Sequence, residues 1–267
     1  RSPQGKPLGG VLLYPANYVK GETYPMVVYV YERQSNDLHQ YIAPNPYAAY
    51  NPQMLSQSGY FVLMPDIAYE RKRHPGQSAL ECTEAALDAV LAKKLGVDPA
   101  RIGIVGHSWG GYEAAFISTV SGRFAAAVCG SGLTDFASLY GNHYYKTGTP
   151  SSVIMEVGQA RMQVPIWEDR EAYLQNSAVW QAPKRKAPLL IQVGDKDDLV
   201  DWNQGLSLYN ALRRLGKEAV LLVYRNEGHR LMGRANQKDY AARLRHFLDV
   251  YLKGAKPEPW LGQPYAP

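Results

Sequence analysis

The sequence predicts an α/β fold, with a mostly parallel sheet flanked by helices on both faces. Apolar segments typical of buried strands alternate with segments whose apolar residues recur at helical spacing. The strand segments are apolar on both faces, as strands between two helical layers are. The chain has 267 residues, 46% hydrophobic and 20% charged, which suits one globular domain of this class.

The expected strands are short runs rich in Val, Ile, Leu and Tyr. The first, YPMVVYVY, is dense in Val and Tyr, and Pro65 ends the second. In chain order the strands cover 24–31, 59–66, 102–105, 124–129, 187–194 and 218–225.

The expected helices show apolar residues three and four positions apart. In the first of them, Ser78 is the expected N-cap and Gly96 the stop signal. In chain order the helices cover 78–95, 112–120, 203–216 and 237–254.

The remaining segments set the domain organisation. Residues 132–186 are rich in Tyr, Gly and Pro, and we expect them to be irregular and to lie over the functional site. We expect residues 1–267 to form a single domain, with tails at 1–8 and 255–267.

Composition argues against several classes of partner. The net charge is +5, and the basic clusters at 71–74 and 184–186 are short, so no nucleic-acid partner is expected. No apolar run reaches the roughly 18 residues of a membrane span, so no membrane partner is expected either. Cys82 and Cys129 fall in a helix and a strand pattern, and no disulfide is predicted.

The stretch RIGIVGHSWGGYEAAF, residues 101–116, runs an apolar strand into a glycine-rich turn and then a helix. A Gly-x-Ser-x-Gly turn in this setting is typical of a nucleophile elbow, which lifts the Ser108 hydroxyl above the sheet edge. The alternative is a plain structural turn. The turn leads into a helix N-terminus, where the Trp109 N–H is placed to donate to an oxyanion.

A nucleophilic serine needs a base, and the base needs an orienting acid. We expect the acid and the histidine to follow the serine in that order, each in a loop after a strand. Of the six histidines, His229 in RNEGHRL follows the late strand 218–225, so it is the predicted base.

The acid should lie in the loop GDKDDLVDW, which follows the strand 187–194. Spacing alone leaves four candidates there. An EF-hand interpretation of the same loop fails, because Val200 and Leu206 stand where a calcium loop requires Gly and Glu. The four candidates are Asp195, Asp197, Asp198 and Asp201.

The motifs GHSWGGY, GDKDDLVDWNQG and NEGHRL resemble the catalytic domain of the prolyl oligopeptidase family of serine peptidases, which has an α/β-hydrolase fold. The resemblance extends from about residue 8 to about residue 254. The family pattern G-x-x-D-x-x-V falls on Gly194, Asp197 and Val200, and this selects Asp197 as the acid.

The resemblance also implies two binding features. The Tyr31 hydroxyl would join the Trp109 N–H in an oxyanion hole, although the following ERQSND departs from the usual turn of the family. Apolar residues after the elbow and its next strand would line the substrate pocket, with ordinary core packing as the alternative. These predicted pocket residues are Tyr112, Leu133, Phe136, Leu139 and Val200.

Family members normally carry an N-terminal β-propeller, and nothing propeller-like is recognisable in this sequence. Because the chain begins at Arg1 rather than Met, we expect it to be the catalytic part of a longer protein; the alternative is a stand-alone hydrolase.

The resemblance implies hydrolysis of oligopeptides through an acyl-enzyme, without a metal or an organic cofactor. A carboxylesterase on the same scaffold is the alternative, because it would use the same three residues. A third hypothesis, a non-catalytic binding module, is disfavoured by the intact Ser, Asp and His.

Overall fold

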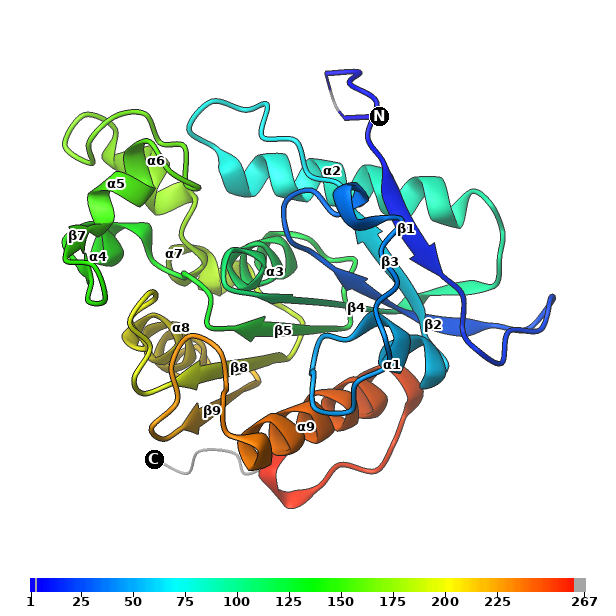
Figure 1. Cartoon of the computed structure of the whole chain (residues 1–267). Helices are drawn as coiled ribbons and strands as arrows, with labels where there is room; N and C mark the ends of the chain where they lie inside the picture. Colours follow the sequence, from blue (N-terminus) through cyan, green and yellow to red (C-terminus); the bar gives the residue numbers. More distant parts are fainter. Residues whose placement is uncertain (3, 262–267) are drawn as a thin grey trace.

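The main sheet has the predicted α/β arrangement. The computed structural model describes residues 1–2 and 4–261 (Figure 1), and seven strands of this part form one sheet in the order β1-β3-β2-β4-β5-β8-β9. Neighbouring strands are parallel except at the edge, where β1 and β3 are antiparallel. The strands are β1 (Gly10–Leu13), β2 (Tyr24–Tyr29), β3 (Phe61–Pro65), β4 (Val97–His107), β5 (Ala126–Gly130), β8 (Leu189–Gly194) and β9 (Ala219–Tyr224).

Helices cover both faces of this sheet, as Figure 1 shows. Alternate side chains of a strand point to opposite faces, so Val28 and Ile104 join one apolar core and Val27 and Val105 the other. The first core lies under α2 (Pro75–Leu91), α3 (Trp109–Val120) and α8 (Asn203–Arg214), and the second under α1 (Pro52–Gln57) and α9 (Arg234–Lys253).

The predicted start of the first long helix was wrong. Helix α2 begins at Pro75, whose fixed φ suits the first helical position, and Ser78 lies inside the helix instead of capping it. The helix ends at Leu91, before the predicted stop at Gly96. Gly96 serves a different purpose: its φ is +90°, and a Cβ there would lie 2.1 Å from the carbonyl oxygen of Glu22.

Other boundaries differ by a few residues. The strand predicted at 24–31 ends at Tyr29, and the strand predicted at 102–105 is the centre of the longer β4. The helix predicted at 112–120 already begins at Trp109, because the glycines of the turn form its first turn. The edge strand β1 and the short helix α1 were not predicted from the sequence.

The segment 132–186 is more regular than predicted. It forms a group of short helices, which lies at the left of Figure 1. Gln204 of α8 anchors its start: the Gln204 side chain accepts a hydrogen bond from the Thr134 N–H at 3.0 Å, and the Thr134 hydroxyl donates to the Gln204 carbonyl at 2.6 Å. The elements are α4 (Phe136–Tyr140), β6 (His143–Tyr144), β7 (Thr149–Pro150), α5 (Ser151–Glu156), α6 (Arg170–Gln175) and α7 (Ala178–Gln181).

Part of the predicted C-terminal tail packs against the domain. Pro259–Leu261 form a short 3₁₀ helix, and the Arg243 guanidinium lies 4.9 Å from the Trp260 ring centre. The rest of that predicted tail, residues 262–267, lies outside the described residues.

Cys82 and Cys129 are both buried and free. None of the helices in the described part of the chain combines the length and the apolar character needed to cross a membrane.

Candidate active site

Ser108 sits on a sharp turn between β4 and α3. Its φ of 57° and ψ of −122° are a backbone conformation that non-glycine residues rarely adopt. The turn can form because its flanking glycines lack side chains: a Cβ on Gly106 would lie 2.0 Å from the carbonyl oxygen of Gly110. The Ser108 N–H donates to the Gly130 carbonyl at 2.8 Å, which fixes the turn to the neighbouring strand β5. The geometry is that of a nucleophile elbow.

The structure brings Ser108, His229 and Asp197 into one hydrogen-bonded chain. His229 Nε2 lies 2.8 Å from Ser108 Oγ, and His229 Nδ1 lies 2.8 Å from Asp197 Oδ2. With the ring proton on Nδ1, His229 donates to the carboxylate and accepts from the serine hydroxyl, which is the arrangement a general base requires.

Asp197 is held by its own loop. Its Oδ1 accepts hydrogen bonds from the N–H groups of Leu199 and Val200, at 3.0 and 2.9 Å. Its side chain is 1% exposed, and that of His229 is 12% exposed. Backbone bonds and burial therefore fix the carboxylate where it meets the imidazole.

The other aspartates of this loop make different contacts. Asp195 accepts from the Asn226 N–H at 2.6 Å, and Asp201 accepts from the Asn203 N–H at 2.9 Å. Asp198 makes no hydrogen bond with the described residues. Only Asp197, of the four candidates that spacing left open, is bonded to His229.

The two loops that carry the predicted acid and the predicted base are hydrogen-bonded to each other. The Lys196 N–H donates to the Glu227 carbonyl at 2.9 Å, and a Cβ on Gly194 would lie 2.3 Å from the same oxygen. The Glu227 carboxylate closes the base loop by accepting from the N–H groups of Met232 and Gly233. The 2.8 Å distance between His229 Nδ1 and Asp197 Oδ2 is thus maintained by two loops that are hydrogen-bonded to each other.

His107 lies next to the serine but does not titrate near neutral pH. Burial, together with the positive charge of its neighbours His229 and Arg230, lowers the pKa of His107 to about 3. Its ring centre is 5.0 Å from that of His229. His107 is therefore an uncharged wall of the site.

The predicted oxyanion donors lie on the side of the elbow that faces β2. Trp109 is the first residue of α3, so its N–H has no acceptor within the helix. Tyr31 follows β2, is 37% exposed, and its ring packs at Gly110, where a Cβ would be 3.3 Å from Cδ2. The oxyanion role of both residues stays a prediction.

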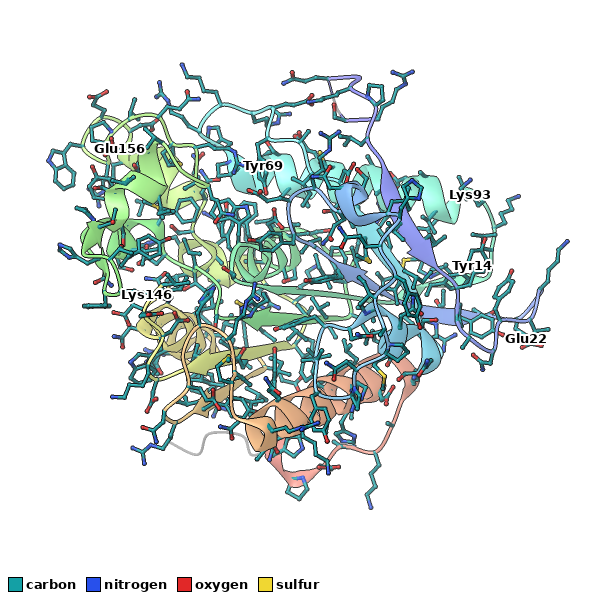
Figure 2. The ribbon with its side chains drawn as sticks, viewed as in Figure 1. Tyr14, Glu22, Tyr69, Lys93, Lys146 and Glu156 are labelled. Carbon is teal, nitrogen blue, oxygen red and sulfur yellow. The ribbon has the colours of Figure 1, made fainter. Side chains whose placement is uncertain are left out.

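A buried polar network that the sequence did not predict supports this side of the elbow. The Trp109 indole N–H donates to the Tyr69 hydroxyl at 2.7 Å, and Tyr69 donates to the carboxylate of Glu113. The Arg161 guanidinium lies 4.0 Å from the Tyr69 ring centre and pairs with Glu32 at 2.9 Å. Figure 2 shows Tyr69 near the place where the short-helix segment meets the rest of the domain.

Burial dominates the electrostatics of Glu113. Its side chain is fully buried, and desolvation raises its pKa to about 8 despite the opposing hydrogen bond from Tyr69. The signal in the sequence was a single carboxylate inside the otherwise apolar helix pattern WGGYEAAFISTV. A charge on the buried face of a helix marks a residue that needs an explanation.

The five predicted pocket residues lie together in one apolar cluster beside Trp109. Tyr112 is central to it, with its ring centre 4.6 Å from that of Trp109 and 4.8 Å from that of Phe136. All five are buried to the degree of core side chains. Their role as a substrate pocket stays a prediction. The five predicted pocket residues in this cluster are Tyr112, Leu133, Phe136, Leu139 and Val200.

A match to a family model decides the family. The model of the prolyl oligopeptidase family matches residues 46–255, which is most of the chain. The chain belongs to the prolyl oligopeptidase family. The resemblance carried by the three sequence motifs is therefore confirmed.

Curated relatives of this prolyl oligopeptidase family chain are named as peptidases. The chain is 23% identical over 258 residues to dipeptidyl-peptidase 5 of Porphyromonas endodontalis. This alignment covers 91% of this chain and 35% of the relative. It is 34% identical over 134 residues to the lasso peptide isopeptidase AtxE2 of Asticcacaulis excentricus, covering 50% of this chain and 18% of the relative. The chain thus spans about a third or less of these relatives.

Solved structures confirm the fold of this family member. A puromycin-hydrolyzing peptidase of Mycobacterium tuberculosis superposes with a TM-score of 0.77 at 22% identity, over 94% of this chain and 38% of the other. An acylaminoacyl peptidase of Pyrococcus horikoshii gives a TM-score of 0.72 at 21% identity, over 94% of this chain and 40% of the other.

Among the described residues, no group of three or more His, Cys, Asp or Glu side chains is placed to hold a metal ion.

Proposed function

We propose that this chain is the catalytic domain of a serine peptidase that cleaves peptide bonds of oligopeptides by acyl transfer. The observation that carries the proposal is the chain of hydrogen bonds from Ser108 through His229 to Asp197, placed at a nucleophile elbow. Membership of the prolyl oligopeptidase family and relatives named as peptidases support the choice of an amide substrate.

The geometry supports a two-step mechanism. Ser108 Oγ attacks the substrate carbonyl while His229 Nε2 takes its proton, and Asp197 stabilises the imidazolium that forms. The Trp109 N–H and the Tyr31 hydroxyl donate to the oxyanion of the tetrahedral intermediate. His229 then gives its proton to the leaving amine, and water hydrolyses the acyl-enzyme by the same route in reverse.

The domain arrangement is part of the proposal. We infer that residues 1–267 act as one catalytic domain and that the full-length protein holds a further domain, as its longer relatives suggest. In the family that the motifs resemble, this further domain is a β-propeller that restricts access to the site.

The deciding experiment compares amide with ester cleavage. A panel of aminoacyl and X-Pro anilides is assayed beside short-chain nitrophenyl esters, with Ser108→Ala as the control. Anilide cleavage that disappears in Ser108→Ala is the expected result, and the best anilide then names the residue preferred at the scissile bond.

Three other results would change the assignment. Ester cleavage without anilide cleavage would favour a carboxylesterase, the alternative that uses the same three residues, and a longer chain would then be assayed before the peptidase is abandoned. Full activity in Ser108→Ala would refute the nucleophile outright. Failure of the wild-type protein to react with a serine-directed phosphonate would favour a non-catalytic module.

A further inference from the structure

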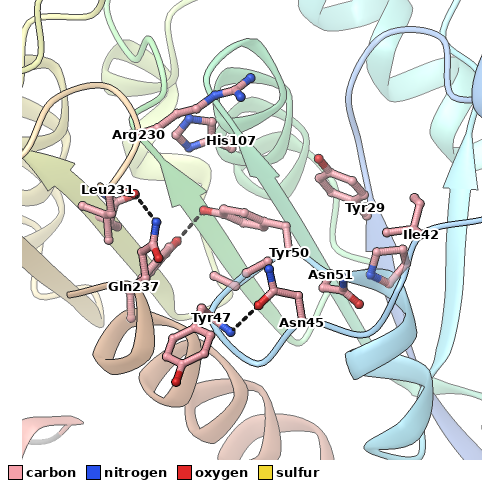
Figure 3. A pocket seen from close by; sticks show the side chains of 15 residues that line it. Tyr29, Ile42, Asn45, Tyr47, Tyr50, Asn51, His107, Arg230, Leu231 and Gln237 are labelled. Atoms are coloured by element: carbon pink, nitrogen blue, oxygen red, sulfur yellow. Dashed lines mark hydrogen bonds between the residues drawn. The ribbon is translucent and has the colours of Figure 1, made fainter. Parts of the chain in front are cut away.

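A cavity of about 480 Å³ lies beside the elbow, on the face of the sheet that α9 covers (Figure 3). His107 at the end of β4 and Tyr29 at the end of β2 both line it. The loop that precedes α1 closes it with Tyr47 and Tyr50, and the loop after the catalytic histidine contributes Arg230. The size is that of a pocket for a small organic group or an amino-acid side chain.

The position of the cavity places it on the side of Ser108 where the leaving group of the substrate would lie. His229 must hand its proton to the leaving amine, so the leaving group lies on the side of Ser108 where His229 stands. The cavity is lined by His107, which precedes Ser108 in the chain, and by Arg230, which follows His229. Trp109, on the other side of the serine, leads into the buried apolar cluster instead.

Aromatic rings make most of one wall. The rings of Tyr29 and Tyr50 are stacked, with centres 6.0 Å apart and planes 16° from parallel. Ile42, at the rim, is 37% exposed, which is high for a large aliphatic side chain. A wall of this kind suits an aromatic or large apolar side chain.

Two hydrogen-bond donors that line the cavity, Arg230 and Gln192, have no acceptor among the described residues. Arg230 is exposed and forms no ion pair with any residue that the structure describes. Gln192 is 1% exposed, and its buried Nε2 has no hydrogen-bond partner among the described residues. His107 is uncharged, so Arg230 supplies the net charge of this end of the cavity, where Figure 3 shows it beside the His107 ring. These donors fit an anionic group with several acceptor atoms.

We propose that this cavity is the subsite for the leaving residue, and that it selects an aromatic or large apolar residue bearing the free α-carboxylate of a peptide's C-terminus. The side chain occupies the tyrosine-lined cavity and the carboxylate pairs with Arg230. The proposal rests on the proposed function, because the leaving side is defined by proton delivery from His229. The preferred substrates are then short peptides that end one residue after the scissile bond.

The test measures binding separately from turnover. The probes are N-acetyl-alanyl-phenylalanine, its C-terminal amide and N-acetyl-alanyl-glycine, titrated calorimetrically into Ser108→Ala. We expect the phenylalanine acid to bind about tenfold more tightly than the amide, as one charge-assisted hydrogen bond at a partly exposed site allows. In the double variant that adds Arg230→Gln, the ratio of acid to amide should fall to about one.

Matched variants separate the effect of the Arg230 charge from the effect of the shape of the cavity. Arg225→Gln removes an exposed arginine near the start of the same loop that does not line the cavity, so the acid-to-amide ratio should persist. Ala48→Trp fills the cavity and should abolish the preference for phenylalanine over glycine. Equal binding of acid and amide to Ser108→Ala, or a ratio that survives Arg230→Gln, would overturn the subsite.

The same probes distinguish this proposal from the proposed function. If binding shows the expected ratio but the wild-type protein cleaves neither these peptides nor the anilides, the cavity stands as a carboxylate-binding site, but the peptidase assignment and the leaving-residue role both fail. If the wild-type protein cleaves anilides through Ser108 but binds acid and amide equally, the peptidase stands and the subsite fails.

Discussion

Gly110 packs so closely against Val30 that a Cβ on Gly110 would lie 2.1 Å from the Val30 carbonyl oxygen. Gly110 belongs to the first turn of α3, and Val30 immediately precedes Tyr31. The contact therefore joins the helix that follows the proposed nucleophile, Ser108, to the strand end that carries the predicted oxyanion donor. Their relative position is set by backbone packing, which a single methyl group would disturb.

Gly110→Ala should damage stability and activity together. The added methyl group must push β2 away from α3, at a cost typical of an overpacked core, about 1–3 kcal/mol in the free energy of unfolding. Urea unfolding and nitrophenyl ester hydrolysis measure the two effects. Gly122→Ala is the matched control, because a Cβ at Gly122 would meet no atom within 4 Å. Wild-type ester kinetics in Gly110→Ala would show that this contact does not position the site.

Asp197→Asn should lower kcat by about 10⁴-fold while leaving the fold intact. An amide at this position no longer holds His229 in the tautomer that accepts the serine proton, although its oxygen can still accept from the Val200 N–H. Steady-state kinetics and near-UV circular dichroism check the two parts of this expectation. Asp198→Asn, which changes the adjacent carboxylate, should keep wild-type kinetics. A comparable loss in Asp198→Asn would mean that the wrong acid has been assigned.

Tyr31→Phe should lower kcat by about 10²- to 10³-fold, the usual effect of removing one oxyanion donor. KM should change little, because the oxyanion forms only after the serine attacks. Tyr41→Phe removes a hydroxyl from a tyrosine that is 80% exposed, and it should be neutral. A Tyr31→Phe variant whose loss lies wholly in KM would place this hydroxyl in ground-state binding instead.

The sequence was sufficient to predict those elements and residues whose pattern lies within one short segment of the chain. The six strands predicted from the sequence are apolar runs between turn residues, and the histidine predicted from its place after the last strand, His229, is the one hydrogen-bonded to Ser108. The acid could not be chosen by spacing, because four aspartates share one loop and only the folded loop turns Asp197 toward the imidazole. The family pattern supplied that choice.

Tertiary contacts decided what local patterns could not. The short helices of 132–186 lack a long apolar repeat, and their starts depend on caps such as Asp135, which accepts from the Ala137 N–H, and Asp169, which accepts from the Ala172 N–H. The partnership of Tyr69 with Glu113 joins residues 44 positions apart in the chain. No periodicity in either segment indicates that contact.

The buried carboxylate of Glu113 gives the stability of this protein a definite pH dependence. The pKa of Glu113 is raised from its ordinary value of 4.5 to about 8, so the folded state keeps a proton that the unfolded state loses. The free energy of unfolding should therefore fall as pH rises from 4.5 to 8, at up to about 1.4 kcal/mol per pH unit, and level off above pH 8. His107, whose pKa is lowered, acts in the opposite direction and only below its ordinary value of 6.5.

Glu113→Gln should remove this dependence, because the amide carries no charge at any pH and can still accept the hydrogen bond from Tyr69. Between pH 6.5 and 8 the wild-type protein should lose about 1–2 kcal/mol more of its unfolding free energy than the variant does, measured by urea unfolding at each pH. Glu22→Gln, at an exposed position, should follow the wild-type curve. If Glu113→Gln and the wild-type protein lose the same amount over this interval, then Glu113 is already ionised in the folded state. In that case Arg161 and the Tyr69 hydroxyl outweigh the cost of burying its charge.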